Sequence, residues 1–123
     1  KLVFQAGRTI EDGAAAALQM INEGVKPTAI QCVNDMVAVG ACETLLSQGH
    51  RVPEDFSVVG FGNILLGQHF RVPLTTVRQP KFHLGEAGMD ALMELMKRQR
   101  PESRRIPAEL VIRASSGPAK VGN

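Results

Sequence analysis

The sequence has no tryptophan and no tyrosine, and its five phenylalanines are its only aromatic residues apart from histidine. Surfaces that bind single-stranded nucleic acid stack bases on aromatic side chains that lie among basic ones. The net charge is only +2, and a cluster of cations falls late in the chain, at Lys97, Arg98, Arg100, Arg104 and Arg105. The first three fall at the end of a predicted helix, where the C-terminal end favours positive charge. We therefore interpret this cluster as a solvated helix end and expect only weak, salt-sensitive DNA binding from these 123 residues.

Long apolar runs are also missing from the chain. No stretch approaches the roughly 20 apolar residues that a membrane-spanning helix requires. Residues 1–4, Lys-Leu-Val-Phe, are too few to form the apolar segment of a signal peptide. The sequence therefore indicates neither a membrane partner nor secretion.

The chain contains only two cysteines, Cys32 and Cys42, and each stands among apolar residues. They do not form a Cys-x-x-Cys pair, and no histidine lies at the spacing of a metal ligand. We interpret them as buried free thiols, which are typical of a reducing cytoplasm. The sequence predicts no metal and no cofactor.

The chain is organised around residues 27–40, which combine a strand, a polar turn and a helix. A short apolar run, 29–33, reads as a buried strand, and Asn34 and Asp35 follow it directly. Both residue types cap helices by accepting hydrogen bonds from free backbone N–H groups. In open α/β sheets, ligands also bind at the carboxyl ends of the strands. The pair can therefore be a helix cap, a ligand contact, or one of each.

The remaining pattern alternates strands and helices. A strand over 2–6 precedes a helix with Thr9 as N-cap and Asp12 completing a capping box, and a strand over 57–61 follows the helix after Asp35. This order predicts the α/β class, a three-layer α/β/α arrangement with a mainly parallel sheet. Beyond it we expect a long helix over 81–98, a last strand over 108–112 and a disordered tail over 115–123.

Several separate motifs occur in a fixed order: PTAI, NDMVAVG, GHRVPEDFSVVGF, VPLTTVRQP, LGEAGMDALMEL and ELVIRAS. In this order the chain resembles the effector-binding domain of the LacI/GalR family of bacterial transcription regulators, which has the type I periplasmic-binding-protein-like fold. The resemblance implies that residues 1–114 are the C-terminal part of that domain. It also implies that 81–106 normally pack on another subdomain, and that DNA is bound only through a headpiece absent from this chain. We expect a fragment of a longer protein.

The resemblance also carries residue roles. It implies effector contacts from Asn34, from the loop at Gly62 and Asn63, and from Gln79, with Asp35 mainly a helix cap. The family usually has an acid where Gly62 stands, so we expect this 123-residue chain to bind effectors weakly. The implied dimer surface comprises the helix after Asp35 and the segment 66–72, with Val39, Cys42, Leu46, His69 and Phe70 as its candidate residues.

The function that this implies is sensing of a small molecule, a sugar or nucleobase, together with dimerisation in a cytoplasmic regulator. A periplasmic solute-binding protein of the same fold is the alternative. The runs GHRVPEDFSVVGF and VPLTTVRQP favour the regulator, because they are typical of it. An enzyme is not indicated, since we find no serine elbow, no paired acids at a strand end and no phosphate loop.

Overall fold

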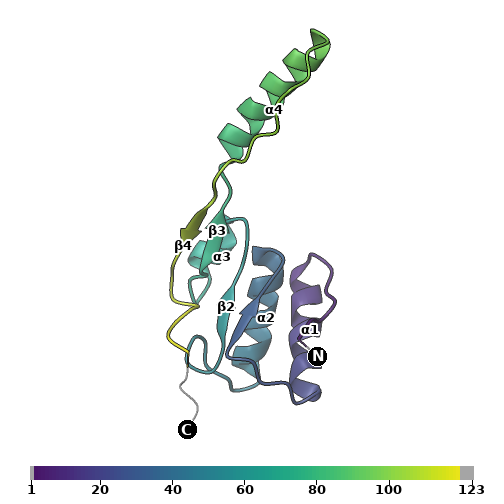
Figure 1. The fold of residues 1–123 in the computed structure, drawn as a ribbon. Coiled ribbons are helices and arrows are strands. Elements are labelled where there is room, and N and C mark those ends of the chain that lie inside the picture. Colours follow the sequence, from purple (N-terminus) through teal and green to yellow (C-terminus); the bar gives the residue numbers. More distant parts are fainter. Residues whose placement is uncertain (1, 120–123) are drawn as a thin grey trace.

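The computed structural model describes residues 2–119. Helices and strands alternate through most of the chain (Figure 1). They are, in order, α1 (Ile10–Asn22), β1 (Ala29–Gln31), α2 (Asp35–Ser47), β2 (Ser57–Val59), α3 (Leu65–His69), β3 (Thr76–Arg78), α4 (Lys81–Met96) and β4 (Glu109–Val111).

The strands follow one another across the sheet in chain order. β1 and β2 pair in parallel, with Ile30 opposite Val58. The parallel arrangement continues from β2 to β3, because Gly60 N donates to Thr75 O at 2.9 Å and Gly62 N to Val77 O at 2.9 Å. β4 then pairs antiparallel with β3. The predicted α/β class with a mainly parallel sheet is confirmed.

α1 begins and ends where its sequence signals predict. Thr9 Oγ1 accepts from Asp12 N at 3.2 Å, and the Asp12 carboxylate accepts from Thr9 N at 2.9 Å, which completes the capping box. Gly24 follows the helix with a φ of 70°, a left-handed conformation that glycine adopts without strain.

α1 and α2 pack against each other through two glycines. A Cβ at Gly13 would overlap the carbonyl oxygen of Val37 and lie 2.8 Å from its Cα. A Cβ at Gly40 would overlap the carbonyl oxygen of Ile10 and lie 3.0 Å from Ala14 N. The two helices therefore approach backbone to backbone, which only glycine permits at these positions.

The hydrophobic core lies between these helices and the sheet. Its buried members come mainly from α1, α2, β2 and the flanking loops: Ala17, Met20, Cys32, Val37, Ala38, Ala41, Cys42, Leu45, Val52, Phe56, Val58 and Leu74. α2 supplies five of these residues, because apolar side chains occupy more than one of its faces.

The predicted strand over 2–6 is wrong. Residues 2–6 carry no strand assignment in the structure, although Phe4 packs against the core. A strand is defined by a hydrogen-bonded neighbour as well as by its own residues. Between this segment and β1 lies a cavity instead, which is described below.

α4 projects away from the rest of the molecule, and the segment that follows it returns alongside (Figure 1). No residue of α4 is buried; Phe82, for example, is 87% exposed and Leu92 51%. Arg104 ties the returning segment to α4 through Asp90 and Glu94, each at 3.4 Å. The helix ends at Met96, two residues before the predicted end.

The prediction that the chain is disordered from residue 115 onward is wrong for the first residues of that tail. Ser115 is fully buried, and its backbone oxygen accepts from Val58 N at 2.7 Å. Gly117 N donates to the Ser57 hydroxyl at 3.1 Å. These bonds attach residues 115–117 to β2 beside β3, so the folded unit extends beyond residue 114. Residues 120–123 of the predicted tail lie outside the described residues.

Candidate functional site

The predicted effector residues lie where three parallel strands end. Asn34 follows β1, Gly62 and Asn63 follow β2, and Gln79 follows β3. Because parallel strands place their carboxyl ends at one edge of the sheet, these residues belong to one edge. Backbone bonds join the strand ends, from Cys32 N to Val59 O at 2.8 Å and from Asp35 N to Phe61 O at 3.1 Å. We call Asn34, Gly62, Asn63 and Gln79 the polar edge.

Asn34, not Asp35, is the N-cap of α2. Its Oδ1 accepts from Val37 N at 2.8 Å, and its Nδ2 donates to Arg8 O at 3.1 Å. The prediction that Asp35 mainly caps is therefore wrong. A primary amide carries two N–H donors, so Asn34 caps the helix and still has a second donor to offer a ligand.

Asp35 has a role that the sequence reasoning missed. Its side chain is 1% exposed, and its carboxylate accepts from Ile64 N at 2.8 Å and from the Thr76 hydroxyl at 2.5 Å. It thereby joins the start of α2 to the loop after β2 and to β3. Gly60 leaves room for it, because a Cβ there would overlap the Asp35 Oδ1.

The loop at Gly62 and Asn63 has two consecutive residues with positive φ angles. Gly62 has a φ of 128° and Asn63 a φ of 55°. Glycine tolerates the first conformation, and asparagine is among the few residues that adopt the second. The glycine at the place of the usual acid therefore matches the conformation of this loop.

Arg113 holds the same loop from the far end of the chain. Its Nη2 donates to Asn63 Oδ1 at 2.7 Å, and its Nη1 donates to Leu74 O at 2.8 Å. Gln68 Nε2 also reaches Asn63 Oδ1, at 3.5 Å. The oxygen of the Asn63 amide is thus engaged within the protein, so what Asn63 can offer a ligand is its Nδ2. Arg113 was not among the predicted site residues.

Gln79 is half-buried between β3 and α4. Its backbone oxygen accepts from Lys81 N at 2.9 Å in the turn that leads into α4. This residue stands at the exit from the sheet, beside the element that projects away from it.

The polar edge offers amide groups: N–H donors of Asn34 and Asn63, whose oxygens are engaged within the protein, and the side-chain amide of Gln79. In the stretches 34–35, 60–64 and 76–80 the only acid is Asp35, and its carboxylate is buried. Arg78 is engaged with Glu109 at 3.2 Å. Among residues 2–119 no group of three or more histidine, cysteine, aspartate or glutamate side chains is placed to hold a metal ion. The arrangement can bind an uncharged polar molecule, and it contains no nucleophile or paired acids for catalysis.

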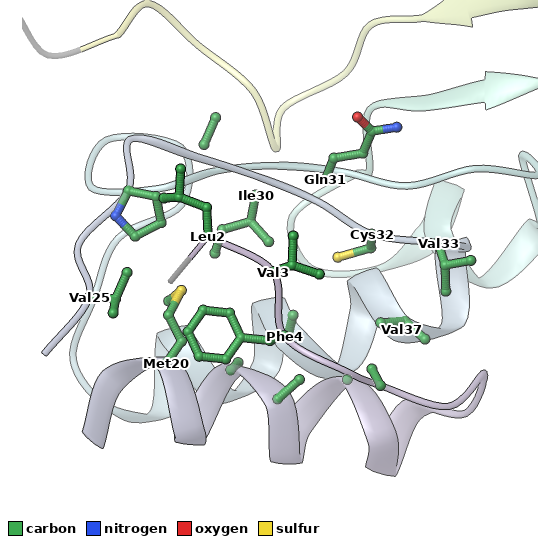
Figure 2. A pocket seen from close by; sticks show the side chains of 17 residues that line it. Leu2, Val3, Phe4, Met20, Val25, Ile30, Gln31, Cys32, Val33 and Val37 are labelled. Carbon is green, nitrogen blue, oxygen red and sulfur yellow. The ribbon is translucent and has the colours of Figure 1, made fainter. Parts of the chain in front are cut away.

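A cavity lies away from the polar edge, between residues 2–6, α1 and β1 (Figure 2). Its volume is about 470 Å³, and most of its lining is apolar, with Val3, Phe4, Met20 and Ile30 among the side chains. No residue of the polar edge lines it. Such a lining suits an apolar side chain or strand better than a polar effector.

Two of the five predicted dimer residues are not at the surface. Cys42 is 0% exposed and belongs to the core, and Val39 is 5% exposed. That part of the prediction is wrong for a single chain, because α2 is already covered on several sides. Burial raises the pKa of the Cys42 thiol to about 12, and it raises that of Cys32 to about 12 with the help of nearby Asp35. Both thiols are therefore protonated at neutral pH.

The other three predicted dimer residues are accessible. Leu46 and Phe70 are half-buried beside the core, and His69 is exposed. Arg71 bonds Glu43 of α2 at 2.9 Å and so fixes the segment after α3 against that helix. Leu46, His69 and Phe70 remain a candidate contact surface.

Within residues 2–119, none of the helices combines the length and the apolar character needed to cross a membrane.

A family described as a periplasmic binding protein-like domain matches residues 2–116. The repressor PurR of Mannheimia succiniciproducens is 38% identical over 115 residues, which cover 92% of this chain and 34% of that protein. The repressor CytR of Escherichia coli K12 is 40% identical over 110 residues, covering 88% of this chain and 32% of that protein. This chain therefore spans about a third of the length of these relatives.

The similar solved structures are also of LacI-type regulators. A lac repressor dimer bound to operator and the anti-inducer ONPF superposes with a TM-score of 0.84 at 33% identity, covering 90% of this chain and 39% of that chain. A LacI family regulator from Arthrobacter sp. FB24 in complex with lactose superposes with a TM-score of 0.80 at 29% identity, covering 93% of this chain and 45% of that one.

Proposed function

This chain belongs to the periplasmic binding protein-like domain family, and on that premise we propose that it is the ligand-sensing and dimerisation part of a LacI-type transcriptional regulator. The observation that supports the proposal is the polar edge, where Asn34, Asn63 and Gln79 each follow one of three parallel strands at the same edge of the sheet. The relatives named above are repressors, which favours a regulator over a periplasmic solute-binding protein. The role is binding without catalysis, in the cytoplasm, where a regulator of this kind acts.

The proposed effector is a sugar or a nucleobase. The amide donors of Asn34 and Asn63 suit hydroxyl, carbonyl and ring-nitrogen acceptors, which both classes carry. Residues 81–106 would pack on a second subdomain. The effector would lie between that subdomain and the polar edge of this one. Its binding would shift the population between two arrangements of the subdomains and so change operator affinity through a headpiece outside these 123 residues.

Gln79→Ala in the longer regulator that contains this chain should weaken effector binding about fivefold, since one net hydrogen bond is worth about 1 kcal/mol. Calorimetry with lactose, ribose, cellobiose and purine bases would identify the effector, and operator binding with and without it would measure the response. Gln48→Ala is the control, because Gln48 is exposed at the C-cap of α2, away from the polar edge. The proposal fails if no effector changes operator affinity, or if both variants respond like the parent.

The 123-residue chain should be a dimer or larger in solution. Leu92 and Leu95 of α4 are 51% and 56% exposed in the single chain, and burying one leucine is worth roughly 2 kcal/mol. Light scattering over a range of concentrations measures the mass. Leu92→Glu tests α4, and Leu46→Glu tests the candidate surface with His69 and Phe70. A monomer mass for the parent at high concentration would refute this expectation.

A further inference from the structure

Asp35 is the one charged side chain among those that the structure describes as buried. A buried carboxylate is costly unless hydrogen bonds and positive charge compensate it. Here the compensation comes from two neutral donors, Ile64 N–H and the Thr76 hydroxyl, and from the first turn of α2, where the helix dipole favours an anion.

These bonds converge on the residues that carry the polar edge. Ile64 directly follows Asn63, and the Thr76 hydroxyl oxygen accepts from Asn63 N at 3.3 Å. Asn34 is the neighbour of Asp35 in the chain and caps the same helix. One carboxylate is therefore linked to the parts of the chain that follow β1 and β2 and to the strand β3.

We propose that Asp35 is the positioning residue of the polar edge. It holds the loop 60–64 against α2 and β3, so that the amides of Asn34 and Asn63 are presented to the same ligand. Asp35 touches no ligand itself, because its side chain is 1% exposed. The inference rests on the proposed function and adds to it the residue that aligns the effector contacts.

A carboxylate suits this position better than an amide. The Ile64 N–H can only donate, and the Thr76 hydroxyl donates its single hydrogen to the other oxygen of Asp35. Ionised aspartate accepts on both oxygens, whereas asparagine replaces one acceptor with a donor. Thr76 is the partner that can be changed with the least effect on shape, because valine has the volume of threonine without the hydroxyl.

The test compares Thr76→Val with Thr76→Ser in the 123-residue chain by NMR amide hydrogen exchange. The probe is the Ile64 amide, which bonds to Asp35 and not to Thr76. We expect Thr76→Val to speed Ile64 exchange at least tenfold while the core amide of Leu45 changes less than twofold. Thr76→Ser, which restores the hydroxyl, should leave both amides within twofold of the parent.

Two outcomes would overturn the inference. In the first, Ile64 exchange in Thr76→Val stays within twofold of the parent. In the second, all amides accelerate together, which would mean that the pair only stabilises the fold as a whole. Neither result depends on an effector, so the exchange experiment decides the inference even if the panel of sugars and purines reveals no ligand.

An effector found with that panel provides a separate measurement in the longer regulator. Thr76→Val should then weaken its binding about tenfold, and Thr76→Ser should bind like the parent. Unchanged affinity in Thr76→Val would overturn the positioning role and leave the proposed function standing. Absence of any effector would instead remove the proposed function and the alignment of effector contacts with it, while the exchange experiment would still decide whether Asp35 holds the loop 60–64.

Discussion

Gly40→Ala should lower the free energy of unfolding by about 2 kcal/mol or more, because overpacking typically costs 1–3 kcal/mol. The new methyl group would overlap the Ile10 carbonyl oxygen, and its Cβ would lie 2.8 Å from the Ile10 carbonyl carbon and 3.0 Å from Ala14 N. Because these are backbone atoms, no side-chain rotation can relieve the overlap, and α1 as a whole must move away from α2. Alanine favours helix over glycine by about 1 kcal/mol, which is too little to reverse the loss.

Gly88→Ala is the matched control for this prediction. Gly88 also lies inside a helix, α4, but no atom lies within 4 Å of a Cβ built there. The same substitution should therefore be neutral or stabilise by up to about 1 kcal/mol, as helix propensity alone dictates. Urea denaturation followed by circular dichroism measures both variants. Equal effects at the two glycines would contradict the close helix crossing.

Helix boundaries could be predicted from the sequence because their signals are local. The capping box at Thr9 and Asp12 spans three residues, and the glycines at 24 and 49 follow the ends of α1 and α2 with φ values of 70° and 83°. The strand over 2–6 could not be predicted in the same way. Its residues have strand-like character, but a strand also depends on how a neighbouring strand is placed, which the segment's own residues do not state.

The position of the candidate site at the strand ends could be predicted from the sequence, but the hydrogen bonds within it could not. The run from Ala29 to Asn34 places polar residues at a strand end, which is a local pattern. The bond between Arg113 and Asn63 joins residues 50 positions apart, and that between Asp35 and Thr76 joins residues 41 apart. Nothing in the residue spacing indicates such contacts. The sequence also did not decide which of Asn34 and Asp35 caps α2, because both residue types cap helices.

The apolar character of α2 misled the prediction of its dimer surface for a physical reason. A helix that is apolar on several faces must be covered on several faces, but the sequence does not say by what. The structure places α1 over one of these faces, where Gly13 and Gly40 allow close contact. Cys42 and Val39 are accordingly buried in the single chain, and Leu46 is left half-buried.

A chain that ends at Ala114 should lose about 3 kcal/mol or more of stability, since a buried polar group left without a partner costs 1–3 kcal/mol. Ser115 serves three buried backbone groups. Its own backbone oxygen accepts from Val58 N at 2.7 Å, its hydroxyl donates to Val58 O at 2.6 Å, and the hydroxyl oxygen accepts from Thr75 N at 2.8 Å. Such a loss is a large part of the 5–15 kcal/mol that stabilises a typical domain.

The matched control for this truncation is a chain that ends at Pro118. It keeps Ser115 and also Gly117, whose backbone exchanges hydrogen bonds with Ser57 at 3.1 and 3.3 Å. Thermal unfolding should show this chain melting close to the parent and the shorter one melting well below it or not folding. Equal melting temperatures for the two truncations would show that the folded unit ends at residue 114. The expected difference in melting temperature would show that Ser115 belongs to the folded sheet, where it joins Val58 of β2 to Thr75, the residue before β3.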